Sequence, residues 1–112
     1  MESYRSGDIV LLEFPFTDAA GTKRRPALVL LDLGDADIVV ARVTSQIAQT
    51  AFDVELVGWQ QAGLRLPSVV RVHKLATLEK NLVEHRLGTL ATADWVQVQV
   101  KVQQLWASIR TL

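Results

Sequence analysis

The sequence predicts a mainly β fold, a small curled β-barrel of five to seven strands followed by a C-terminal α-helix at about residues 92–110. Short apolar runs recur between Gly, Pro and polar clusters, which is typical of strands. The last segment is longer than strands usually are, which favours a helix there. With 112 residues, 49% of them hydrophobic, the chain is long enough for one small core, so we expect a single domain over 1–112.

The first two strands are predicted at residues 9–12 and 27–31, with a polar loop between them. Pro15 ends the first strand because proline has no N–H to donate to a sheet. Three cations lie where the loop enters the second strand, namely Lys23, Arg24 and Arg25. Pro26 keeps the residue before it extended. The two strands are therefore expected to present a basic tip on a stiff base, which is the outline of a binding site.

The third strand is predicted at residues 38–46. Because side chains alternate along a strand, one face is expected to carry Ile38, Val40, Arg42, Thr44 and Gln46. The opposite face carries only the apolar residues Val39, Ala41 and Val43. The first face turns polar toward its C-terminal end, where we expect a site if the sheet curls.

Three further strands are predicted at residues 53–57, 69–78 and 82–90, with a turn or short helical loop at 58–66. Gly88 indicates a weak point or a bulge in the last of them. A cation and an imidazole, Arg71 and His73, lie two residues apart on the strand at 69–78, so their side chains are expected to point the same way, about 7 Å apart.

The last segment fits two patterns. Residues 96–102, VQVQVKV, alternate as a strand would, but the same segment also forms a helical stripe of Trp95, Val98, Val102, Leu105, Trp106 and Ile109. Thr92 is suited to be the N-cap, and Asp94 suits the positive end of a helix dipole. The length favours the helix. Several short strands followed by one helix indicate an SH3-like barrel.

Composition limits the classes of function. Twelve basic and twelve acidic residues give a net charge of zero, which argues against a general nucleic-acid coat but allows a local basic patch. Cysteine is absent, so disulfides and zinc–thiolate sites are excluded. No apolar run approaches the ~20 residues that span a membrane. The N-terminal MESYRSGD lacks the apolar core of a signal peptide, so we expect a cytoplasmic protein.

The motifs favour chemistry without a metal or a cofactor. His73 and His85 have no HExxH pattern or carboxylate cluster beside them, and there is neither a GxSxG motif nor a glycine-rich phosphate loop. Cleavage of RNA fits this inventory because the substrate's 2′-hydroxyl is the nucleophile. The protein need supply only a base, an acid and cations that stabilise the charge on phosphorus, roles suited to His and Arg.

The segment GDIVLLEFPFTD…KRRPALVL resembles the opening of the MazF/PemK family of toxin endoribonucleases. Four later segments continue the resemblance in order: RVTSQ at 42–46, DVEL at 53–56, AGLRLPSVVRVHKLATL at 62–78 and RLGTL at 86–90. The family's catalytic arginine precedes a proline, which implies Arg25, and its catalytic threonine begins a T-[ST]-Q triplet, which implies Thr44. The Kid/PemK branch has Arg and Asp two apart on a later strand. Here the pair reads Arg71 and His73, and the first loop lacks the histidine of some members.

The resemblance implies sequence-specific, metal-independent cleavage of single-stranded mRNA, leaving 2′,3′-cyclic phosphate and 5′-hydroxyl ends. In this hypothesis Arg25 and Arg71 would hold and neutralise the phosphate, Thr44 would orient the phosphate or the 2′-hydroxyl, and His73 would move a proton. The RNA-binding candidates are Thr17, Lys23, Arg24 and Gln46. It further implies a homodimer, a cognate antitoxin as partner, and no cofactor.

Two other functions fit the same residues. The replacement of Asp by His73 and the missing loop histidine are also compatible with a non-enzymatic module that binds nucleic acid or protein. A gyrase-poisoning toxin would need an apolar end of the C-terminal helix, which Trp106, Ile109 and Leu112 supply in part. RNA cleavage in vitro distinguishes the endoribonuclease from both alternatives.

Overall fold

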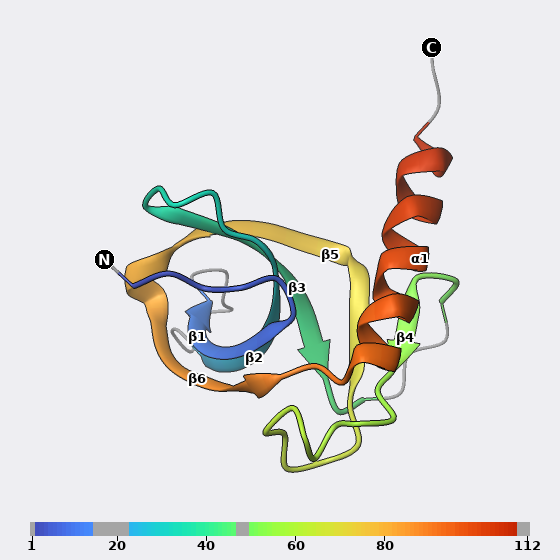
Figure 1. The fold of residues 1–112 in the computed structure, drawn as a ribbon, viewed down its shortest axis with the longest axis horizontal. Coiled ribbons are helices and arrows are strands. Elements are labelled where there is room, and N and C mark those ends of the chain that lie inside the picture. The colour runs from blue at the N-terminus through green and yellow to red at the C-terminus, as the bar shows by residue number, and fades with distance from the viewer. Residues whose placement is uncertain (1, 15–22, 47–49, 110–112) are drawn as a thin grey trace.

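The computed structural model describes residues 2–14, 23–46 and 50–109. Six strands, one short 3-10 helix and one α-helix make up this part of the chain (Figure 1). The elements are β1 (Asp8–Phe14), β2 (Lys23–Leu31), β3 (Asp37–Thr44), β4 (Asp53–Glu55), β5 (Val69–Glu79), η1 (Lys80–Leu82), β6 (Val83–Thr89) and α1 (Thr92–Ser108). The predicted strand count and the C-terminal helix are confirmed.

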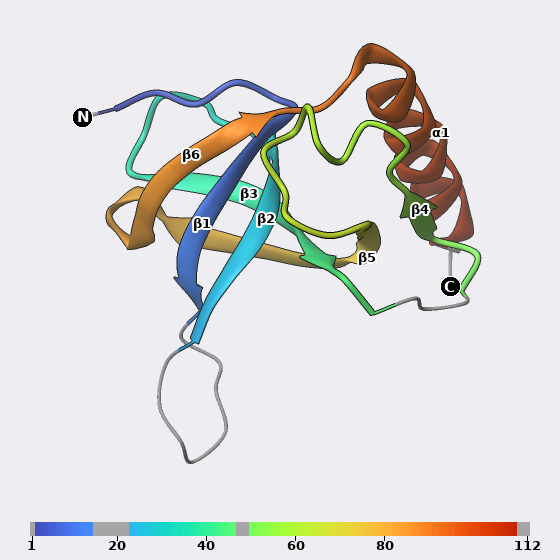
Figure 2. The same ribbon diagram turned by 90° about the horizontal axis from the view of Figure 1, so that it is seen from below.

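All six strands belong to one antiparallel sheet in the order β4-β5-β3-β2-β1-β6. The sheet curls around on itself, with α1 outside the curl beside β4 and β5 (Figures 1 and 2). Within the described residues, no pairing joins the two outer strands β4 and β6, so the sheet is a curled but open barrel.

Both faces of the curled sheet are apolar, so two clusters form its core. Alternate residues of β2 divide between them: Leu28 belongs to one cluster, and Ala27 and Val29 belong to the other. The first cluster includes Val98 of α1 and therefore covers the outer face. The second fills the inside of the curl with Tyr4, Val10, Leu12, Ala27, Val29, Ile38, Val40 and Leu78.

The helix differs from its prediction in two respects. Thr92 is not the N-cap: Ala91 occupies that position without a side-chain cap, and Asp94 is buried in the first turn. The predicted apolar stripe is buried in part, because Val98 is fully buried and Trp95 and Leu105 pack against the core. Three other members of the stripe are exposed, namely Val102, Trp106 and Ile109. No helix in the described ranges has the length and apolarity needed to cross a membrane.

Strand boundaries shift by a few residues. β2 begins at Lys23 rather than residue 27, since Lys23, Arg24 and Arg25 pair with the end of β1. β3 ends at Thr44, which places Gln46 beyond the strand. The bulge predicted near Gly88 is confirmed, because the β1–β6 register shifts between the pairs Ile9–Gly88 and Val10–Arg86.

Candidate anion-binding site

A hollow of about 480 Å³ lies where β2 begins and β3 ends. Residues 63–68, which connect β4 to β5, form another of its walls. It is lined by Leu11, Arg25, Pro26, Arg42, Val43, Thr44, Ser45, Gln46, Gly63, Leu64, Arg65, Leu66, Ser68 and Leu87. The structure thus brings together three of the predicted site residues: Arg25, Thr44 and Gln46.

Strand register explains why Arg25 and Thr44 meet. Ala27 of β2 pairs with Arg42 of β3 in an antiparallel ladder. Arg25 lies two residues before Ala27, and Thr44 lies two residues after Arg42. Because the two strands are antiparallel, Arg25 and Thr44 therefore lie side by side at the same end of β2 and β3. Pro26 keeps Arg25 in the extended conformation that this placement requires.

The wall at residues 63–68 is held in place by close packing against β6. A Cβ atom at Gly63 would overlap the carbonyl of Leu87, and its φ of +84° is one that other residues rarely adopt. A Cβ atom at Gly88 would lie 2.6 Å from the backbone of Ala62. These two glycines allow the connection and the strand to approach backbone to backbone.

A buried carboxylate fixes the other end of the same connection. Asp94, in the first turn of α1, accepts hydrogen bonds from the backbone N–H groups of Val57 at 3.0 Å and Gly58 at 2.8 Å. This places a negative charge at the positive end of the helix dipole and ties the connection to the helix. The wall of the hollow therefore depends on both α1 and β6.

Thr44 is oriented by the chain that follows it. Its hydroxyl oxygen accepts a hydrogen bond from the N–H of Gln46 at 3.1 Å. A hydroxyl can accept and donate at the same time, so its own proton remains available to a ligand in the hollow. The turn at residues 44–46 thus prepares a donor beside Arg25.

The hollow is positively charged in the part of the chain that the structure describes. Arg25, Arg42 and Arg65 line it and are exposed, and no ion pair within the described residues involves any of the three. The described lining contains no Asp or Glu. Guanidinium groups with hydroxyl and amide donors beside them form an environment that favours a phosphate or another oxyanion.

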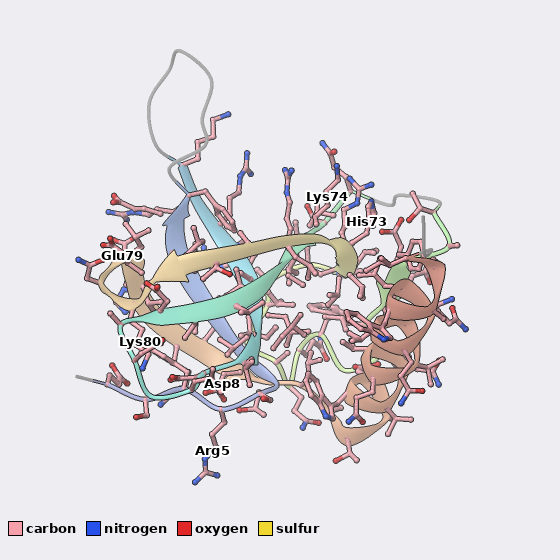
Figure 3. All side chains as sticks on the ribbon, turned by 90° about the horizontal axis from the view of Figure 1, so that it is seen from above. Arg5, Asp8, His73, Lys74, Glu79 and Lys80 are labelled. Atoms are coloured by element: carbon pink, nitrogen blue, oxygen red, sulfur yellow. The ribbon has the colours of Figure 1, made fainter. Side chains whose placement is uncertain are left out.

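Arg71 and His73 are not among the described lining residues of the hollow. Arg71 is opposite Arg42 in the β3–β5 ladder and forms an ion pair with Asp53, Nε to Oδ1, at 3.4 Å. His73 is on β5, on the α1 side of the molecule (Figure 3), with its ring centroid 6.0 Å from that of Phe52. Its Nδ1 is buried and has no hydrogen-bond partner in the described part of the chain.

The other predicted RNA-binding residues are placed differently. Arg24 pairs with Glu84 at 2.8 Å, and its side chain is 67% exposed. Lys23 is exposed at the first position of β2. Neither belongs to the described lining of the hollow. Thr17 lies outside the described residues.

Four polar lining residues were not predicted as site residues: Arg42, Ser45, Arg65 and Ser68. For Arg42 a signal was present in the sequence, because it shares the face of Thr44 and Gln46 by alternation. Arg65 and Ser68 lie in the connection between β4 and β5. Their place in the lining depends on the path of that connection, which the alternation along a strand does not predict. No group of three or more His, Cys, Asp or Glu side chains suited to a metal occurs in the described ranges.

Charges at the far side of the sheet contrast with this site. Lys80 and Asp32 form a buried ion pair at 2.8 Å, and Asp32 also accepts hydrogen bonds from the N–H groups of Tyr4 and Gly34. The Lys80 side chain, followed by these two N–H groups, lowers the pKa of Asp32 to about 2. Arg86 donates to Asp8 at 3.1 Å and stacks over the ring of Tyr4 at 5.0 Å. Asp8 and Lys80 lie well away from His73 in Figure 3.

Comparison with known proteins finds a family of toxins and several solved structures that are similar to this chain. The family model for PemK-like, MazF-like toxins of type II toxin–antitoxin systems matches residues 5–106. A MazE–MazF structure from Deinococcus radiodurans is similar at 25% identity and a TM-score of 0.75, over 95% of this chain and 98% of that one. The Mycobacterium tuberculosis toxin MazF-mt6 is 19% identical, with a TM-score of 0.74, over 92% and 99%.

An endoribonuclease from a mycobacterial species is 16% identical, with a TM-score of 0.76, and the match covers 99% of this chain and 98% of that one. No curated protein matches the chain. These three matches cover at least 92% of this chain, so the similarity of fold extends over nearly all of it.

Proposed function

Because the chain belongs to the PemK-like, MazF-like toxins of type II toxin–antitoxin systems, we propose that it is an endoribonuclease that cleaves single-stranded RNA in the cytoplasm. The observation that carries the proposal is the hollow at the start of β2 and the end of β3. There, three arginines without ion-pair partners in the described residues surround a donor hydroxyl. A similar structure is described as an endoribonuclease, which agrees with this chemistry.

Arg25 is proposed to hold the scissile phosphate. Attack by the 2′-hydroxyl places additional negative charge on the non-bridging oxygens, and a positioned guanidinium stabilises that charge in the transition state. Its planar fork can donate to two of these oxygens at once. Because Pro26 restricts the backbone beside it, little backbone freedom of Arg25 is lost when the phosphate binds.

Thr44 and Gln46 are proposed to orient the phosphate. The Thr44 hydroxyl already accepts from the N–H of Gln46, so its O–H can donate to a phosphate oxygen without losing that bond. The Gln46 side chain, which is part of the same lining, offers an amide donor and an acceptor to a base or a ribose. Single-stranded RNA is the proposed substrate because its unstacked bases expose their edges to such groups.

His73 is proposed to transfer the proton. It lies two residues after Arg71 on β5. Arg71 forms an ion pair with Asp53 and is opposite Arg42, which lines the hollow, and this position of Arg71 supports the proposal. The buried Nδ1 lacks a partner in the described residues, so Nε2 is the nitrogen proposed to exchange the proton. The products would carry 2′,3′-cyclic phosphate and 5′-hydroxyl ends, and no metal would be required.

Two protein partners belong to the proposal. Similar structures include a MazE–MazF assembly and an endoribonuclease with its cognate antitoxin, so we expect an antitoxin that binds this chain. We also expect a homodimer in solution. Light scattering of the purified protein at micromolar concentration tests the dimer, since a mass near the 12.4 kDa of one chain would contradict it.

The test of the function is cleavage of a long single-stranded RNA in the presence of EDTA, with mapping of cut sites and end groups. Cuts at one short sequence with cyclic phosphate ends support the proposal. A strict requirement for magnesium, or 5′-phosphate ends, would falsify it. No cleavage with retained RNA binding would favour the non-enzymatic binding module, and gyrase-dependent DNA breaks would identify a gyrase poison.

A further inference from the structure

A row of three charged residues crosses the sheet at the site. Asp53 of β4 pairs in register with Arg71 of β5, and Arg71 pairs in register with Arg42 of β3. The row therefore holds two guanidinium groups and one carboxylate. Like charges directly opposite each other on neighbouring strands are unfavourable. A cation placed opposite another cation is a local cost to the free protein.

The carboxylate of this row serves only one of the two cations. Asp53 pairs with Arg71 at 3.4 Å, and the Arg71 side chain is 23% exposed. Arg42 is exposed and takes part in no ion pair or hydrogen bond that involves its side chain within the described residues. Among the described residues, no carboxylate therefore pairs with the positive charge of Arg42.

The residues around Arg42 indicate which kind of ligand would neutralise its positive charge. It lines the same hollow as Arg25 and Arg65, and it lies two residues before Thr44, about 7 Å along the strand. RNA is a chain of regularly spaced phosphates, so a strand held at Arg25 brings further phosphates close by. An unpaired guanidinium beside the first one is placed to bind the next.

Resting on the proposed function, we propose that Arg42 is a substrate-positioning residue that binds a phosphate adjacent to the scissile one. It acts on affinity and register rather than on the reacting bond. The two cations Arg42 and Arg71 repel each other in the free protein. An RNA phosphate bound to Arg42 in the hollow would relieve that repulsion. The ligand is RNA because the hollow also offers the hydroxyl and amide donors described above.

The test separates binding from cleavage. The probe is a short fluorescein-labelled single-stranded RNA with every 2′-hydroxyl methylated, which cannot supply the nucleophile. Its Kd is measured by anisotropy over a series of KCl concentrations for the native protein, Arg42→Gln and Arg42→Lys. One lost phosphate contact lowers the slope of log Kd against log[KCl] by about 0.7. We expect that change for Arg42→Gln, and a slope close to native for Arg42→Lys because the charge is kept.

Arg5→Gln is the matched control. Arg5 is exposed on the side of the sheet away from His73 (Figure 3) and does not line the hollow. It changes net charge by the same amount, so it corrects for general electrostatic attraction. A drop in slope as large for Arg5→Gln as for Arg42→Gln overturns the inference.

Thermal unfolding without RNA provides a second readout. Relief of the repulsion with Arg71 should leave the Tm of Arg42→Gln equal to or above that of the native protein at low salt. A clear fall in Tm would assign Arg42 a structural role and overturn the inference. Native RNA cleavage with an unchanged slope in Arg42→Gln would also overturn it while leaving the proposed function intact. Absence of probe binding by the native protein would overturn both.

Discussion

The two ends of the curled sheet treat charge in opposite ways. At one end, where β1 begins and η1 lies, Asp8 is bonded to Arg86 and Asp32 to Lys80, and both carboxylates also accept backbone N–H groups. At the other end, three exposed arginines surround a hollow whose described lining has no carboxylate. Compensated charges fix the fold at the first end. At the second end, the three arginines have no ion-pair partner within the described residues, and they favour the binding of an anion such as phosphate.

The largest expected effect is at the second end. Arg25→Ala should reduce RNA cleavage by about 10³-fold, because the charge that develops on the phosphate loses a positioned cation. Cleavage rates are measured on one RNA substrate in EDTA, with Arg5→Ala as the control, since Arg5 is exposed and does not line the hollow. Equal loss in both variants would mean that the position of Arg25 is not special.

A smaller loss is expected from the hydroxyl beside it. Thr44→Val keeps the shape of the side chain but removes the donor, and it should slow cleavage by about 10²-fold. Thr44→Ser should recover most of the rate because it restores the O–H group. If valine and serine act alike, the side chain contributes packing rather than a hydrogen bond to substrate.

The compensated end predicts an effect on stability that depends on pH. The lowered pKa of Asp32, about 2 against an ordinary 3.8, means that its ionised form stabilises the fold above about pH 4. This contribution declines as the pH falls from about 4 toward 2. Asp32→Asn should therefore lower Tm at pH 7, and the difference from the native protein should shrink toward pH 2. Glu55→Gln, exposed on β4, is the control; a Tm difference for Asp32→Asn that does not change with pH would contradict the assignment.

The smallest effect is expected at Arg24, which precedes Arg25 on β2 but, unlike Arg25, forms an ion pair within the described residues. Arg24 pairs with Glu84, and the Arg24 side chain is 67% exposed, so the pair should contribute no more than about 1 kcal/mol to stability. Arg24→Gln should change RNA affinity by a few-fold at most, less than Arg25→Gln in the same anisotropy titration. An effect as large as that of Arg25→Gln would extend the RNA contact from the hollow to the tip of β2.

Much of the fold could be predicted because the alternation of apolar and polar residues along a strand indicates which of its faces is buried. The alternation along β3 identified both its apolar faces and the polar end that lines the hollow. The burial of the helix was harder to predict. Its apolar pattern continues through Val102 and Trp106, yet these residues are exposed, because the C-terminal part of α1 extends past β4 and β5 (Figure 1). The apolar periodicity of the helical segment does not indicate how far the sheet beside it extends.

Only part of the residues that line the hollow could be predicted from the sequence. Arg25 and Thr44 followed from their motifs, and the sheet brings both to the hollow. Arg65 arrives through a connection whose path depends on Gly63 packing against Leu87, a contact between distant segments. The pairing of Arg71 with Asp53 likewise depends on which strand lies beside β5. Such contacts arise only after the chain has folded.

The bonds from Asp94 to the N–H groups of Val57 and Gly58 join the first turn of α1 to the start of the connection that later forms the wall of the hollow. Local opening occurs in cooperative units rather than residue by residue. In native-state hydrogen exchange, the amides of Val57 and Gly58 should therefore exchange together with the first turn of α1, while those of β2 and β3 exchange more slowly.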